Sequence, residues 1–184
     1  MENSLTTSGT IPNLTRESNS IMAIDLRPVT AEDAEFLYSV YASTRADEMA
    51  RVDWTAEQQD AFLRMQFRAQ SQFYIENYPG AEFKVITQTG QPIGRLYIHK
   101  RENEIRIMDI ALLPEFRGQG IGSVLLQDIL EQGKNLNLPV TIHVEQFNPA
   151  MHLYRRLGFR LKEDKGVYWL MEWSPKKKEQ TAHA

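Results

Sequence analysis

A glycine-rich segment carries the residue pattern in this chain that most directly suggests chemistry. It reads Arg117-Gly118-Gln119-Gly120-Ile121-Gly122 and follows an apolar run from Arg106 to Leu113 that predicts a buried strand. Glycine lets the backbone approach a ligand closely, and the free N–H groups and positive dipole end of a helix attract anions. The segment therefore predicts a pyrophosphate site at a helix start. Arg117 either adds a positive charge there or serves as a surface ion-pair partner.

Two better-known glycine loops fit the segment poorly. A P-loop requires Lys followed by Ser or Thr after its last glycine, whereas Gly122 is followed by Ser123-Val124. A dinucleotide fingerprint requires the spacing Gly-x-Gly-x-x-Gly after a βαβ strand, but these glycines alternate and the preceding strands look antiparallel. A nucleoside triphosphatase and a nicotinamide enzyme are both disfavoured. Tight packing at a helix start remains an alternative role for the glycines.

A second segment further along the chain allows a family resemblance to be stated. It reads Asn148-Pro149-Ala150-Met151-His152-Leu153-Tyr154-Arg155-Arg156-Leu157-Gly158-Phe159 and is separated from the glycine segment by a predicted helix and strand. The two segments, in this order, resemble the GNAT superfamily of N-acetyltransferases, whose signature is Arg/Gln-x-x-Gly-x-Gly/Ala. The resemblance is strong over residues 105–159 and rests on the order of elements over residues 24–97.

The resemblance implies acetyl-CoA as the cosubstrate, with no metal ion. It implies that Leu112 and its neighbours offer backbone groups to the pantetheine arm. Asn148 is implied to lie near the pantetheine and the adenosine end, although it could equally cap the helix that opens at Pro149. The full set of implied contacts is Ala111, Leu112, Leu113, Arg117, Gly118, Gln119, Gly120, Ile121, Gly122, Ser123, Asn148 and Ala150.

The resemblance also implies a reaction in which a neutral amine attacks the thioester directly. A phenol at Tyr154 would protonate the departing thiolate, whereas without the resemblance its ring would be assigned to the inner face of a helix. The general base stays unassigned among Asp109, Glu145 and His143. A non-catalytic acyl-CoA sensor or interaction module is the alternative function, and a longer acyl donor is also open.

The acceptor is an unidentified amine, on a small molecule or a protein. The region that would bind it, residues 45–78, combines acidic and aromatic side chains, which is compatible with an amine. Acidic residues on helices usually form a solvated face and aromatic residues usually form core, so the composition does not select a class of acceptor.

Start and stop signals predict the elements that must position these residues. Thr30 and Thr55 begin helices, the second ending near Tyr78. The predicted strands cover residues 23–27, 83–86, 93–98, 106–113 and 140–144. A helix over residues 120–134 joins the last two of these in a right-handed parallel crossover. A helix from Pro149 to Leu157 and a hairpin of residues 158–161 and 167–171, with its turn at 163–166, complete the chain. We expect Ile121, Val124, Leu125 and Ile129 on the inner side of the third helix.

These elements predict an α+β fold with a mixed, mostly antiparallel sheet of about seven strands, flanked by about four helices, with the parallel crossover at the acyl-CoA site. The 184 residues, 42% of them hydrophobic, suffice for one core. We expect a disordered tail over residues 1–20, one domain over 21–174 and a polar tail over 175–184. A shorter product starting at Met22 should still fold.

Bulk properties narrow the class of partner. A net charge of −3 gives no overall attraction for nucleic acid, no apolar run reaches the ~18 residues of a membrane span, and the four histidines lack metal-ligand spacing. The absence of cysteine is compatible with a reducing compartment. We therefore expect a soluble cytoplasmic protein, and an exposed end strand of its sheet could support a homodimer.

Overall fold

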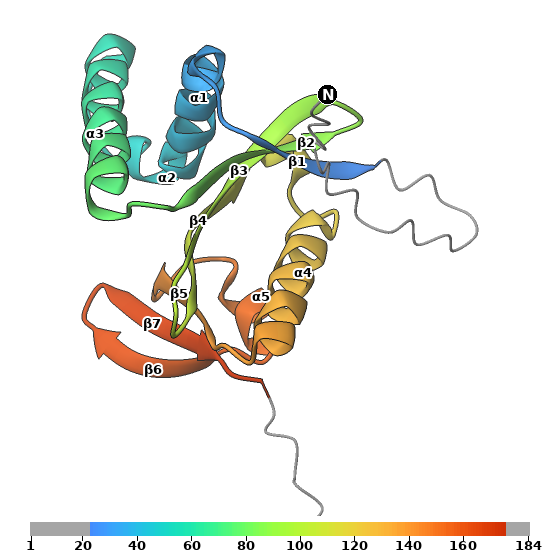
Figure 1. Cartoon of the computed structure of the whole chain (residues 1–184). Helices are drawn as coiled ribbons and strands as arrows, with labels where there is room; N and C mark the ends of the chain where they lie inside the picture. The colour runs from blue at the N-terminus through green and yellow to red at the C-terminus, as the bar shows by residue number, and fades with distance from the viewer. Residues whose placement is uncertain (1–22, 176–184) are drawn as a thin grey trace, which may run out of the picture.

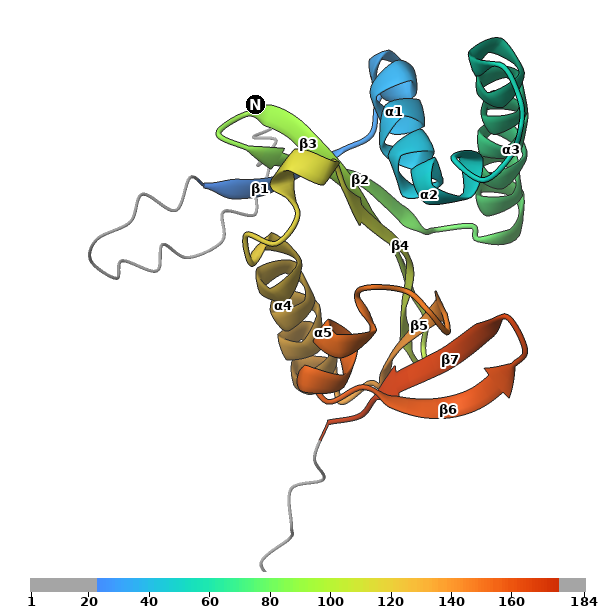
Figure 2. The same ribbon diagram turned by 180° about the vertical axis from the view of Figure 1, so that it is seen from behind.

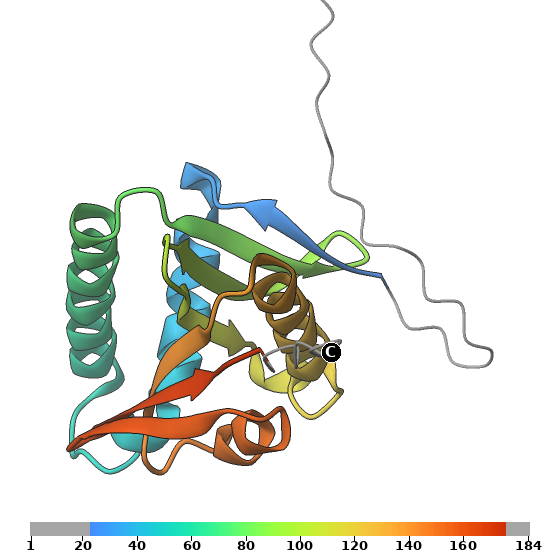
Figure 3. The same cartoon turned by 60° about the horizontal axis from the view of Figure 1, so that its bottom comes forward.

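The computed structural model describes residues 23–175, and a seven-stranded sheet runs through them in the order β1-β2-β3-β4-β5-β7-β6. Helices α1, α2 and α3 lie on one side of the sheet and α4 and α5 on the other (Figure 1 and Figure 2). Figure 3 shows α3 (teal) and α4 (gold-brown) on opposite sides of the sheet. The predicted α+β fold is confirmed. The expectations for residues 1–20, for a start at Met22 and for the tail after Pro175 lie outside the described residues.

The elements follow the predicted order, with short additions. The strands are β1 (Ile24–Pro28), β2 (Glu82–Gln88), β3 (Gln91–Lys100), β4 (Ile105–Leu112), β5 (Val140–Glu145), β6 (Arg160–Lys165) and β7 (Tyr168–Trp173). The α-helices are α1 (Ala34–Thr44), α2 (Ala46–Met49), α3 (Ala56–Asn77), α4 (Ile121–Leu136) and α5 (Met151–Arg156), with single 3-10 turns at Ala31–Asp33 and Pro114–Phe116. The short helix α2 and these 3-10 turns were not predicted.

Both predicted helix starts carry local hydrogen bonds, and the Thr55 side chain caps α3 as expected. At α3, the Gln58 N–H donates to the Thr55 hydroxyl oxygen at 3.3 Å, and the Thr55 N–H donates to the Gln58 side-chain oxygen at 2.9 Å. Before α1, the Asp33 carboxylate accepts from the Thr30 N–H at 2.8 Å. These local bonds fix where the first two long helices begin.

The sheet opens between its two central strands. β4 and β5 are parallel neighbours, but only the residues from Ile105–Val140 to Ile107–Ile142 pair in register. The ladder between β3 and β4 also shifts register, because Ile98 pairs with Ile107 and Tyr97 with Asp109, which leaves Met108 as a bulge. Beyond this point β4 and β5 diverge, and the opening between them contains the candidate site.

Two hydrophobic clusters hold the layers together. The larger packs α4 and α5 against the sheet, and the smaller joins α1 to α3. The expectation that Val124 lies on the inner side of α4 is wrong, because its side chain is 54% exposed. The buried positions of α4 recur at helical spacing on a stripe that excludes it, namely Ile121, Leu125, Leu126, Ile129, Leu130 and Gly133.

The last hairpin is longer than predicted and its turn lies elsewhere. Lys165 pairs with Tyr168, so the turn consists of Gly166 and Val167 instead of residues 163–166. Gly166 adopts a φ of +80°, and its N–H donates to the Asp164 carboxylate at 2.9 Å. The polar residues predicted as turn belong to β6, whose six residues are all exposed.

Candidate functional site

The glycine segment forms an open cradle of backbone N–H groups at the start of α4. Gly118 and Gly120 have φ values of +73° and +84°, and the space where their side chains would project is empty within 4 Å. The first helical bond runs from the Val124 N–H to the Gly120 carbonyl at 3.1 Å. The N–H groups of Ile121, Gly122 and Ser123 therefore precede the helical hydrogen bonds and are free to bind an anion.

The Arg117 side chain lies across the end of β4. Its Nε donates to the Leu112 carbonyl at 2.8 Å, and a terminal nitrogen donates to the Ser43 hydroxyl at 3.0 Å. The guanidinium thus ties β4 to the C-terminal end of α1. Contact of Arg117 with a pyrophosphate stays a prediction. Beside it, the Gln119 side chain donates to the Glu115 carbonyl at 2.7 Å, which fixes the entry to the cradle.

A second arginine, which the sequence analysis missed, reaches the cradle from α5. A terminal nitrogen of Arg156 donates to the Ser123 hydroxyl at 3.3 Å, which places a positive charge beside the first turn of α4. The sequence signal was available, because Arg156 stands in the second motif two residues after Tyr154. Its exposed position leaves it free to meet an anionic ligand.

The end of β4 presents backbone groups to the opening. The Leu113 N–H donates to the Ile93 carbonyl on β3 at 2.9 Å and is therefore already used. Because backbone groups alternate sides along a strand, those of Leu112 face the other way, towards β5. The Leu112 carbonyl is occupied by Arg117, so the Leu112 N–H is the donor that remains for a ligand.

Asn148 closes the turn that precedes α5, which begins at Met151 and not at Pro149 as predicted, with Ala150 as its N-cap. Its side-chain oxygen accepts from the Ala150 N–H at 2.8 Å, and its carbonyl accepts from the Met151 N–H at 3.0 Å. Asn148 also lines the pocket between the strands, so ligand contact at Asn148 and Ala150 stays a prediction.

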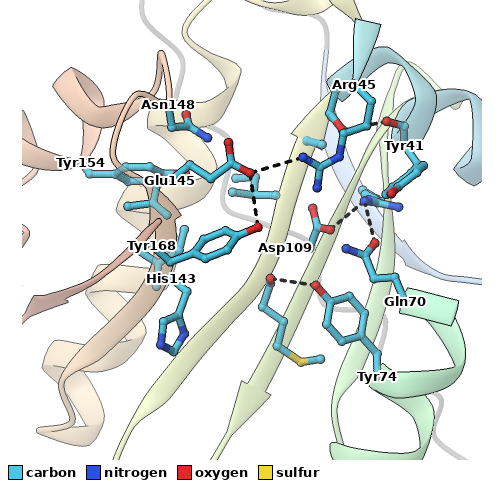
Figure 4. A pocket seen from close by; sticks show the side chains of 17 residues that line it. Tyr41, Arg45, Gln70, Tyr74, Asp109, His143, Glu145, Asn148, Tyr154 and Tyr168 are labelled. Atoms are coloured by element: carbon cyan, nitrogen blue, oxygen red, sulfur yellow. Dashed lines mark hydrogen bonds and ion pairs between the residues drawn. The ribbon is translucent and has the colours of Figure 1, made fainter. Parts of the chain in front are cut away.

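A cavity of about 350 Å³ occupies the opening between β4 and β5 (Figure 4). Tyr154 reaches it from α5 with only 4% of its surface exposed. Burial, and secondarily the negative charge of Asp109, raises the pKa of the Tyr154 phenol to about 12. The phenol therefore stays protonated at neutral pH, as a proton donor must. The cavity is lined by Tyr41, Thr44, Arg45, Gln70, Tyr74, Arg95, Met108, Asp109, Ile110, Ala111, Ile142, His143, Val144, Glu145, Asn148, Tyr154 and Tyr168.

The three candidate bases all line this cavity, in different settings. The Asp109 carboxylate accepts from a terminal nitrogen of Arg95 at 2.7 Å, and the Arg95 side chain is 3% exposed. Glu145 projects from β5 towards Arg45, as Figure 4 shows. Burial, with the nearby positive charge of Arg106, lowers the pKa of His143, so its ring is neutral at pH 7.

The side of the pocket near α1 and α3 is formed by residues that the sequence did not indicate. Arg45, Gln70 and Tyr74 line it, and the Tyr74 hydroxyl donates to the carbonyl of the bulged residue Met108 at 3.5 Å. Burial raises the pKa of Tyr74 as well. These residues belong to no sequence motif, and only tertiary packing brings them close to β4.

Residues 43–159 match the model of the acetyltransferase (GNAT) family, which spans more than half of the chain. The chain belongs to this family. The glycine segment and the Tyr154 segment that first suggested a GNAT protein both fall within the matched residues. The match also reaches back to Ser43, and so includes α2 and α3.

Individual GNAT relatives share the fold at modest identity. A mycothiol acetyltransferase of Thermobifida fusca is 33% identical over 81 residues, which are 43% of this chain and 22% of that protein, so the alignment spans less than a quarter of it. A putative [ribosomal protein bS18]-alanine N-acetyltransferase of Bacillus subtilis is 28% identical over 138 residues, covering 73% of this chain and 80% of that one. The structure of the PaiA N-acetyltransferase from Thermoplasma acidophilum in complex with coenzyme A superposes with a TM-score of 0.64 at 19% identity, covering 83% and 99% of the two chains.

Two kinds of feature, a metal-binding cluster and a membrane-spanning helix, were sought among the described residues. Between Ala23 and Pro175, no cluster of three His, Cys, Asp or Glu side chains is arranged to hold a metal ion. Within the same part of the chain, no helix combines the length and apolar character needed to cross a membrane.

Proposed function

We propose that this GNAT protein transfers an acetyl group from acetyl-CoA to a primary amine by direct attack, with Tyr154 as the general acid. The observation that carries the proposal is the position of Tyr154, whose buried, protonated phenol lines the cavity where β4 and β5 diverge. The same proposal places the protein in the cytoplasm, where acetyl-CoA is available to it.

The proposed binding mode for acetyl-CoA rests on the cradle and the strand opening. The free N–H groups at the start of α4 would hold the pyrophosphate, with Arg156 adding a positive charge. The pantetheine arm would lie along β4 at Ala111, Leu112 and Leu113, where the Leu112 N–H faces the opening. The space above Gly118 and Gly120 supports this mode, because a phosphate can approach the backbone there.

The reaction transfers one proton from the amine to the thiol. The amine nitrogen attacks the thioester carbon, a C–N bond forms, and a tetrahedral oxyanion appears that a β4 backbone N–H can stabilise. Collapse of this intermediate breaks the C–S bond, and the Tyr154 phenol protonates the departing thiolate. The proton lost by the amine balances the one given by Tyr154, so the products are an N-acetyl amide and free CoA.

Calorimetric titration with acetyl-CoA tests the cradle directly. Gly120→Glu places bulk and negative charge where the pyrophosphate would lie, and binding should be lost. Gly80→Glu is the matched control, because Gly80 has the same backbone conformation (φ of +83°) and open surroundings but lies between α3 and β2. Equal loss in both variants would indicate a general defect of folding.

A second experiment separates an enzyme from a sensor. Protein that binds acetyl-CoA is incubated with a panel of primary amines, and both thiol release and acetylated product are measured. Turnover of any amine supports the proposal. Failure of the natural protein to bind acetyl-CoA would overturn it, and tight binding without turnover of any amine would favour a sensor or interaction module.

A further inference from the structure

Glu145 is held by one carboxylate oxygen and left free at the other. Its Oε1 accepts from a terminal nitrogen of Arg45 at 3.3 Å and from the Tyr168 hydroxyl at 3.4 Å. Within residues 23–175, Oε2 makes neither of these contacts nor any other hydrogen bond. The side chain lines the cavity and is 39% exposed, so Oε2 has access to both a ligand and solvent.

The two rival groups differ from Glu145, Asp109 in its ion pair and His143 in its direction. Asp109 lies in a short ion pair with Arg95, and protonating it would leave that buried guanidinium without its counter-charge. Asp109 is also mostly buried, with 14% of its side chain exposed, whereas that of Glu145 is 39% exposed. His143 points away from the contacts that join Glu145 to Arg45 and Tyr168 (Figure 4).

We propose that Glu145 is the general base, and that Tyr168 and Arg45 are positioning residues that hold its Oε1 so that Oε2 faces the acceptor amine. This inference rests on the proposed acetyl transfer. As the C–N bond forms, the amine nitrogen becomes cationic, and its proton passes to Oε2 directly or through one water molecule. Glu145 then releases the proton to solvent, from which Tyr154 is reprotonated after it has protonated the thiolate.

The fold explains how the two positioning residues reach Glu145. Glu145 and Tyr168 are directly opposed in the antiparallel ladder of β5 and β7, which puts their side chains on one face at close range. Arg45 arrives from the junction of α1 and α2, and its contact with Glu48 at 2.8 Å anchors it on that side. The long contacts to Oε1 fix its direction, while the carboxylate stays free to change its protonation state.

The test uses glycinamide, a small primary amine, as the acceptor, after wild-type turnover of it has been established. Glu145→Gln should lower kcat about 100-fold, the size of a typical general-base contribution, and leave the acetyl-CoA affinity within two-fold. Sodium formate should partly restore the rate of Glu145→Ala, and sodium chloride should not, because only formate can accept a proton. Glu163→Gln, on the exposed strand β6, is the matched control and should behave as wild type.

Tyr168→Phe separates positioning from folding. It should lower kcat several-fold without changing the KM for acetyl-CoA, whereas a structural defect would change both. Wild-type activity in Glu145→Gln, or the loss of activity in Asp109→Ala with formate rescue there instead, would overturn this inference alone. Failure of the wild-type protein with glycinamide and with every amine of the panel would overturn the proposed function as well.

Discussion

Gly94 on β3 lies opposite Leu112 at the end of β4, with no room for a side chain between the strands. A Cβ at Gly94 would lie 2.3 Å from the Ala111 carbonyl oxygen and 2.8 Å from Cδ2 of Leu112. Gly94→Ala must therefore displace the part of β4 proposed to bind pantetheine. We expect a loss of stability of about 1–3 kcal/mol, as for other overpacked sites, and a weaker affinity for acetyl-CoA.

Thermal unfolding and calorimetric titration measure these two effects. Gly122→Ala serves as the stability control, because its Cβ would meet only Leu153 at an ordinary 3.6 Å. Alanine also favours a helix, so this control should unfold at the wild-type temperature or above it. If Gly94→Ala binds and unfolds as the natural protein does, β3 and β4 have more freedom than their close approach indicates.

Tyr154→Phe should remove the proposed acid and retain its packing. The ring contacts Phe159 edge-on, with 5.8 Å between centroids, and phenylalanine preserves that contact. We expect kcat to fall about 100-fold while acetyl-CoA affinity and melting temperature change little. Because burial raises the pKa of the phenol to about 12, ionisation of Tyr154 should not reduce the rate between pH 7 and pH 10.

A steady-state pH profile of the wild-type protein checks the second half of that prediction. A fall in kcat centred near pH 10, absent from Tyr154→Phe, would mean that the phenol ionises at its ordinary value and is not shielded in the cavity.

Asp33 should make the free energy of unfolding depend on pH. Hydrogen bonds from Arg27, at 2.7 and 2.8 Å, hold the pKa of the Asp33 carboxyl well below its usual range, in spite of its burial. A lowered folded-state pKa contributes stability above the unfolded value of about 3.9, and this contribution is lost as the pH falls through the folded value. We expect Asp33→Asn to cost about 2 kcal/mol at pH 7, with a smaller difference from wild type at pH 3.

Urea unfolding at several pH values gives this comparison. Glu32→Gln, a neighbouring exposed acid in the same 3-10 turn, should have little effect at any pH. A constant difference between Asp33→Asn and wild type from pH 7 to pH 3 would contradict the linkage.

Arg156 should contribute to acetyl-CoA affinity through its charge beside the cradle. We expect Arg156→Ala to weaken binding about five-fold, equivalent to about 1 kcal/mol, and the difference to shrink as salt is added. Arg155→Ala is the control, because Arg155 lies over the Trp169 ring instead, at 5.8 Å. Calorimetric titrations with acetyl-CoA at low and high salt measure these differences. Equal acetyl-CoA affinities of Arg156→Ala and Arg155→Ala would exclude a specific role for Arg156.

The parts of the molecule that were predictable from sequence are those fixed by neighbouring residues. The capping residues Thr30 and Thr55 mark helix starts through bonds that span three positions, and the glycine segment needs only its own backbone conformation. Tyr154 was found because it sits in a motif. Val124 was misplaced because helical periodicity alone does not say which of two adjacent stripes meets the sheet.

The contacts among Arg45, Glu145 and Tyr168 were not predictable, because they depend on residues that are distant in the sequence. Arg45 and Glu145 are 100 positions apart, and their contact depends on how α1 lies over the sheet. Tyr168 joins them only through the register of β5 and β7, two strands that are not consecutive in the chain.

The short parallel contact between β4 and β5 has a mechanical consequence. Within the described residues, three successive backbone pairs, beginning with Ile105 and Val140, join the two halves of the sheet, and the core under α4 packs against both. A cosubstrate lying along the diverging strands would act as a strut that braces the two halves against each other. Cosubstrate binding would then stiffen the opening between β4 and β5, and this rigidity would be lost each time free CoA departs.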